Sequence, residues 1–179
     1  MSLFVATLIP GIVLLLLGGI LLWKGKRVGG AFKLFPRSQR AAYVTLGLAA
    51  VWTLSHITQL GEADMGNYKT PLFIGFAAVA ILSFKYVPDF LSVRGACALF
   101  LLSADVFLSA AYMHYEFPQR LFLVYFVYLG ILISLYLAFA PFRLRDFIDW
   151  ICNQESRSRF MGGLLFTYGL ILTVVSFTY

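Results

Sequence analysis

Six long apolar runs constrain this chain of 179 residues more than any other feature. A helix needs about 20 mostly apolar residues to cross a bilayer, because it rises about 1.5 Å per residue and the hydrocarbon is about 30 Å thick. Each run meets or approaches that length, and none shows the period of two that marks the strands of a membrane barrel. We therefore expect an all-α integral membrane protein, a bundle of about six transmembrane helices. The runs are residues 3–23, 41–60, 70–87, 95–115, 121–140 and 160–178.

The composition favours the same class and a single domain. Hydrophobic residues make up 61% of the chain and charged residues only 12%, whereas about a quarter of the residues in soluble domains are charged. No linker or low-complexity stretch divides the chain, so residues 1–179 are expected to form one membrane domain. The net charge of +6 does not indicate nucleic acid as a partner, because the cations lie between the apolar runs.

The lysines and arginines collect in alternate connections between the runs. Of the 14 in the chain, only Lys69 and Arg120 fall on one predicted side. Because Lys and Arg are retained in cytoplasmic connections, we predict that the rich side is cytoplasmic and that both termini are non-cytoplasmic. The cations of the rich side are Lys24, Lys26, Arg27, Lys33, Arg37, Arg40, Lys85, Arg94, Arg143, Arg145, Arg157 and Arg159.

Two segments on the predicted cytoplasmic side are expected to contact the membrane surface. Residues 24–40 carry six cations and no acid, which would attract anionic lipid headgroups at about 1 kcal/mol per cation. Between the fifth and sixth runs, Phe147, Ile148, Trp150 and Ile151 are clustered among charges. This pattern predicts a short helix lying in the cytoplasmic interface.

Asp105 is the most unusual residue, because it lies within the fourth run, ten residues from each end. A charge at that depth is costly, so we expect the carboxyl group to face the bundle interior and to be protonated, paired or hydrated. Ser109 and Tyr112 share its helix face. One hypothesis is a proton- or cation-handling site, and the other is a protonated Asp that hydrogen-bonds between helices. A relay normally has more than one intramembrane acid, which favours the second.

A second polar group is predicted at the non-cytoplasmic face. Imidazole and carboxylate are suitable ligands for zinc or iron, and two histidines can hold a haem. The spacing matches no metal-binding motif, however, and polar residues collect at membrane exits in any case. A solvated rim without metal is therefore expected, with a metal or haem held by His56 and His114 as a minor hypothesis. The residues of this group are His56, Gln59, Glu62, Asp64, His114 and Glu116.

Paired glycines predict close contact between helices. Gly11 and Gly18 lie seven residues apart in the first run, and Gly162 and Gly169 have the same spacing in the last. Each pair therefore shares one helix face, where small residues let two backbones approach. Such a face can meet another helix of this chain or a second subunit.

The leading functional hypothesis is non-enzymatic: a small carrier, or an integral subunit of a larger membrane complex, with Asp105 as the interior polar residue. The alternative is a membrane enzyme that acts on a lipid or quinone-like substrate at the non-cytoplasmic face through the His and carboxylate group. A pure assembly scaffold, including a homo-oligomer, is a third. No nucleotide-binding or soluble-enzyme motif occurs, and the sequence indicates no cofactor or substrate.

Overall fold

The computed structural model describes residues 1–61, 66–87 and 89–179, and for residues 24–29 and 31 it describes the backbone alone. All helices and turns included, the regular secondary structure of these residues is helical, and no strand occurs among them. Six of the described helices are long and apolar enough to cross a membrane. The predicted all-α class and the six long apolar helices are therefore confirmed, and their passage through a membrane stays a prediction.

The helices follow the predicted runs, with three differences of more than two residues. The helix of the fourth run begins and ends four residues early, and the helix of the first run continues past Trp23 to Leu34. The helix of the sixth run begins five residues early, at Glu155. The elements are α1 (Leu3–Leu34), the 3-10 helix η1 (Phe35–Arg37), α2 (Gln39–Thr58), the 3-10 helix η3 (Gly66–Tyr68), α3 (Lys69–Tyr86), α4 (Leu91–Ala111), α5 (Arg120–Phe139), α6 (Phe142–Asn153) and α7 (Glu155–Ser176).

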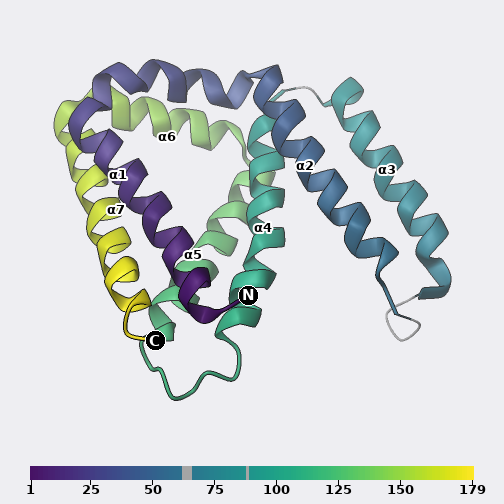
Figure 1. The fold of residues 1–179 in the computed structure, drawn as a ribbon. Coiled ribbons are helices and arrows are strands. Elements are labelled where there is room, and N and C mark those ends of the chain that lie inside the picture. Colours follow the sequence, from purple (N-terminus) through teal and green to yellow (C-terminus); the bar gives the residue numbers. More distant parts are fainter. Residues whose placement is uncertain (62–65, 88) are drawn as a thin grey trace.

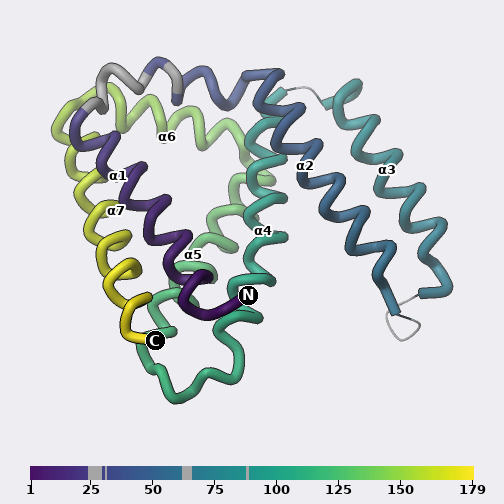
Figure 2. Tube along the Cα trace, in the orientation of Figure 1, coloured from purple at the N-terminus to yellow at the C-terminus, as the bar shows by residue number. Residues whose placement is uncertain are grey.

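The long helices form a bundle with a two-helix wing. α1 pairs with α7, α4 packs on α5, and α2 packs on α4. α2 leans away from the bundle and carries α3 on its far side, so that α3 has no buried residue (Figure 1). Both termini lie at one end of the bundle, and η1, α6 and the start of α4 lie at the other (Figure 2). The cation-rich connections thus gather at this second end, which we call the cationic end.

Two helical segments run across the cationic end. The last part of α1 turns away from the bundle axis and lies beside α6, which crosses the same end (Figure 1). An ion pair links the two segments, because Lys33 Nζ lies 3.0 Å from an Asp149 carboxylate oxygen. The short helix that was predicted between the fifth and sixth runs is thus present as α6. Its location in a membrane interface stays a prediction.

α1 and α7 meet through the paired glycines. A Cβ atom at Gly18 would lie 2.5 Å from the Phe166 nitrogen, and one at Gly169 would lie 2.7 Å from the Leu15 nitrogen. Cβ atoms at Gly11 and Gly162 would be similarly crowded, at 2.7 and 2.9 Å from their nearest neighbours. The two backbones are therefore in direct contact, and the predicted role of the glycine pairs is confirmed within this chain.

A buried apolar cluster joins three helices towards the opposite end of the bundle. It includes Ala6 of α1, Ala104 of α4 and Leu123 of α5. Arg120 lies near this cluster in sequence, and its guanidinium group donates a hydrogen bond to the Ala111 carbonyl oxygen, the last of α4, at 2.7 Å. A cation at the C-terminus of a helix satisfies a free carbonyl and interacts favourably with the helix dipole. One of the two cations outside the cationic end thus caps α4.

Candidate functional site

Asp105 lies on an exposed side of α4, not in the bundle interior. The expectation that its carboxyl group faces the interior is therefore wrong for this chain by itself. The reason is that α2 and α5 contact other sides of α4. α4 meets α2 at Gly95, where a Cβ atom would lie 2.5 Å from the Leu46 nitrogen, and it meets α5 through Phe100, which stacks edge-on with Phe126 at 6.2 Å. At 100° per residue, Asp105 lies about 80° from the first contact and about 140° from the second.

Ser109 is exposed one turn further along α4, on the side of Asp105. Tyr112 is exposed as well, but it follows the end of α4 with an extended backbone, so the predicted helix face that joins it to Asp105 does not form. Because α4 ends at Ala111, Asp105 is six residues from its end, about 9 Å along the helix axis, instead of the ten residues expected. Within the part of the chain that the structure describes, no hydrogen bond or ion pair reaches the Asp105 carboxyl group. The result is one acidic group, with the Ser109 hydroxyl one turn further along, on the exposed side of a candidate span.

The predicted polar group at the other end of the spans is only partly brought together. Trp52 Nε1 donates to His56 Nε2 at 2.9 Å, and His114 Nδ1 lies 3.7 Å from a Glu116 carboxylate oxygen. Each histidine is thus engaged by a neighbour in its own segment. The ends of α2 and α4 lie apart (Figure 1).

The structure describes one of the remaining members of this group. Gln59 is the exposed residue directly after α2, and Glu62 and Asp64 lie outside the described residues. Among the described side chains, no three of His, Cys, Asp or Glu are placed to share a metal ion. The geometry therefore gives no support for a metal or haem between the two histidines.

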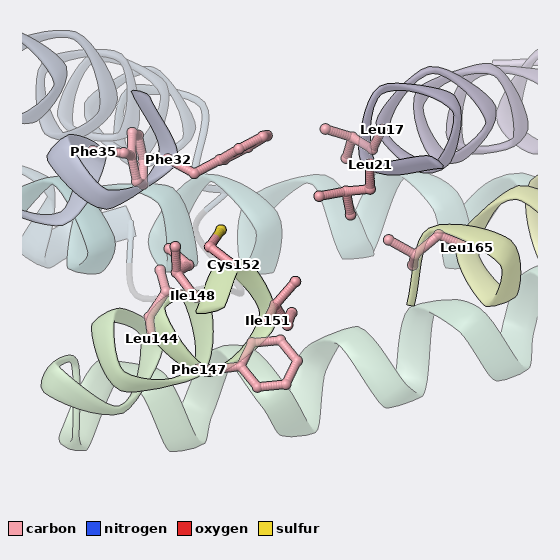
Figure 3. A pocket seen from close by; sticks show the side chains of 10 residues that line it. All are labelled: Leu17, Leu21, Phe32, Phe35, Leu144, Phe147, Ile148, Ile151, Cys152 and Leu165. Atoms are coloured by element: carbon pink, nitrogen blue, oxygen red, sulfur yellow. The ribbon is translucent and has the colours of Figure 1, made fainter. Parts of the chain in front are cut away.

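An apolar cavity at the cationic end was not predicted. It has a volume of about 530 Å³, within the range of about 300–1,000 Å³ that is usual for small-molecule sites. Leu17 and Leu21 of α1 line one side, Phe32 and Phe35 line another, and α6 with Leu165 of α7 completes it (Figure 3). No single segment shows this site in the sequence, because its lining comes from three helices and η1.

Comparison with known families, with curated proteins and with solved structures finds no match for this chain. The class is therefore defined by the fold alone: an all-α chain whose six long apolar helices are compatible with a polytopic membrane protein. The exposed carboxyl group of α4 and the apolar cavity are the two features from which its function has to be argued.

Proposed function

We propose that this chain is an integral subunit of a membrane complex, which binds a transmembrane helix of another protein against the Asp105 side of α4. In this proposal the six apolar helices cross the bilayer, the cationic end is cytoplasmic, and both termini are non-cytoplasmic. The lysine and arginine bias supports that orientation, and the amphipathic α6 is suited to the cytoplasmic interface.

The exposure of Asp105 carries the proposal. Lipid can solvate the exposed apolar side chains of α2 and α3 without any partner, so their exposure does not require one. A carboxyl group is different, because hydrocarbon offers it neither water nor a hydrogen bond. An acid on the outer side of a span is stabilised when a neighbouring helix supplies a cation or a hydrogen-bond donor at the same depth.

The chemistry of the sequence favours a different protein as the source of that helix. Asp105 is the only charged residue inside the predicted fourth run, and no Lys or Arg lies at a matching depth in another run. Two copies joined at this side would bring two Asp105 groups together, which is unfavourable unless one is protonated. A partner helix with a Lys, Arg, Asn or Gln side chain meets the requirement directly.

The other hypotheses have less support from the geometry. A carrier needs the carboxyl group on a path between the helices, whereas Asp105 lies outside the contacts of α4 with α2 and α5. The enzyme hypothesis needs His56 and His114 in one site, whereas each contacts a residue of its own segment.

The test is the size of the complex after extraction from native membranes in a mild detergent. We expect Asp105→Leu to release this chain from its partner, because a lost charge-assisted hydrogen bond weakens binding by at least about ten-fold. Asp105→Asn should weaken the complex less, since an amide still hydrogen-bonds. Ile81→Ala, a change at an exposed apolar position of α3, is the control and should leave the complex intact.

Two results would contradict the proposal. One is a wild-type chain that migrates alone at every detergent concentration. The other is a complex that survives Asp105→Leu unchanged. Loss of pH-dependent flux in vesicles that contain only Asp105→Asn protein would instead support the carrier hypothesis.

A further inference from the structure

Among the residues whose side chains the structure describes, those that line the cavity at the cationic end are apolar. They are aromatic and aliphatic, and the Cys152 thiol is the most polar group among them. A polar small molecule needs a few placed hydrogen-bonding groups to fix its orientation, and this lining offers almost none. The geometry is suited to a flexible hydrocarbon chain, for which burial of apolar surface is sufficient.

The size of the cavity agrees with one such chain. Its volume of about 530 Å³ is in the range of sites that enclose one small molecule, and this is the order of size that a single alkyl chain requires. The lining continues along the apolar face of α6 from Leu144 to Cys152. Half of the lining residues therefore come from α6, which faces Leu17 and Leu21 of α1 across the cavity (Figure 3).

Two guanidinium groups lie near the ring of Phe90, and both belong to residues that are close in sequence to this lining. Arg37 lies 5.6 Å from the centre of the Phe90 ring, and Arg145 lies 6.0 Å from the same ring. Arg37 follows the lining residue Phe35 by two positions, and Arg145 directly follows Leu144. We call Arg37, Arg145 and Phe90 the arginine cluster.

The backbone of Phe90 is strained in this cluster. Its φ of 57° is a left-handed conformation that a bulky residue rarely adopts and that usually marks a functional or over-determined position. Both arginines hold their charges over the face of the ring, where the cation is attracted by the ring electrons.

The charge of the surroundings indicates an anion. Arg145 also bonds to Asp146 at 2.8 Å, but Arg37 has no carboxylate partner within the described residues. Around the cluster, the predicted cytoplasmic connections carry twelve cations against four acids, Asp89, Asp146, Asp149 and Glu155. Basic sites between helices at the cytoplasmic side are suited to phosphate headgroups.

We propose that the cavity holds one alkyl chain of an anionic glycerophospholipid whose phosphate lies at the arginine cluster. The proposal shares the membrane embedding with the proposed function but does not depend on a partner at Asp105. The two can therefore fail separately: the lipid site is tested on the purified chain alone, whereas the subunit role is tested on the complex.

Cys152 gives a reporter inside the cavity. In a Cys97→Ala background it is the only cysteine, and its reaction with N-ethylmaleimide is followed in neutral detergent micelles that contain either phosphatidylglycerol or phosphatidylcholine of the same chains. We expect phosphatidylglycerol to protect Cys152 at about thirty-fold lower concentration, because its net negative charge is attracted by two cations at about 1 kcal/mol each, whereas the choline group of phosphatidylcholine cancels the charge of its phosphate. Glycerol 3-phosphate alone should not protect, since it brings no chain.

Matched variants separate the site from the general charge of this end. Arg37→Gln with Arg145→Gln should remove the preference for phosphatidylglycerol. Arg40→Gln with Arg143→Gln removes the same charge from neighbouring positions and should keep the preference for phosphatidylglycerol.

A second pair of variants tests the cavity itself. Ile148→Trp fills the cavity and should slow the reaction of Cys152 in the absence of lipid. A cysteine at exposed Ser156 in a Cys152→Ser background should react equally in both lipids.

Three results would overturn the proposal: equal protection by the two lipids, equal loss of preference in the two double variants, or protection by glycerol 3-phosphate. Should the Arg37 and Arg145 double variant fail to elute as a folded species, Ile148→Trp decides the case. Lipid protection that persists in that filled cavity contradicts the site.

Discussion

Ser92 is the residue that fixes the chain at the cationic end. Its buried hydroxyl group lies 2.8 Å from the Phe35 carbonyl oxygen and 2.9 Å from that of Pro36. Its own carbonyl oxygen accepts from Thr45 Oγ1 at 3.2 Å. One serine thus joins η1, α2 and α4, and it holds Phe35, part of the cavity lining, against the start of α4.

Ser92→Ala should therefore lower the stability of the protein by about 1–3 kcal/mol, the cost of leaving buried carbonyl groups without a donor. Ser83→Ala is the control, because the Ser83 hydroxyl donates within its own helix to Val79 at 2.7 Å and its loss should cost less than about 1 kcal/mol. Unfolding of both variants in detergent, followed by circular dichroism, gives the comparison. Equal midpoints would show that the Ser92 contacts contribute nothing.

Asp105 shows what the sequence could and could not predict at this scale. Its presence in an apolar run is visible in the sequence, and so is the helix face that it shares with Ser109, whereas Tyr112 was wrongly placed on that face because α4 ends at Ala111. Its direction is not, because the direction depends on which side of α4 is taken by α2 and α5. The end of α4 was also missed, since the residues after Ala111 are aromatic and apolar enough to extend the predicted span.

At the scale of elements, the pairing of α1 and α7 was predictable because glycines at a spacing of seven leave one face of each helix without side chains. The extension of α1 to Leu34 was not, because residues 24–34 are mostly charged or small and resemble a connection. α6 was predicted from its amphipathic pattern. The cavity between these elements was missed, because it exists only after they pack.

The α1 and α7 pair gives a matched test. A methyl group at Gly18 would meet the Phe166 nitrogen and the Gly162 carbonyl oxygen, which are backbone atoms and cannot rotate away, whereas one at the adjacent Gly19 meets nothing within 4 Å. Gly18→Ala should destabilise the protein by about 1–3 kcal/mol through overpacking. Gly19→Ala should be neutral or stabilising by up to about 1 kcal/mol, since alanine favours helices.

Thermal unfolding in detergent measures both glycine variants. Gly163→Ala repeats the control on α7, because a Cβ atom there also meets nothing within 4 Å. A Gly18→Ala protein as stable as Gly19→Ala would mean that the two helices do not pack through this face.

At the scale of the whole molecule, most of the predictions came from the lengths of the apolar runs and from the positions of the lysines and arginines between them. Six apolar runs became six long helices, and the alternate connections rich in lysine and arginine gathered at one end of the bundle (Figure 1). The wing formed by α2 and α3 was not predictable, because lipid solvates apolar helices whether or not they join the bundle. The functional proposals all depend on the two ends lying in different compartments.

Cysteine labelling in intact cells tests that dependence most directly. In a background of Cys97→Ala and Cys152→Ser, single cysteines are introduced as Gln119→Cys, at an exposed position between α4 and α5, and as Ser156→Cys, at an exposed position in the first turn of α7. A membrane-impermeant maleimide should label the Gln119 position from outside, and the Ser156 position only after the membrane is permeabilised. Labelling of both positions, or of neither, before permeabilisation would contradict the account, and labelling of Ser156 alone would reverse its orientation.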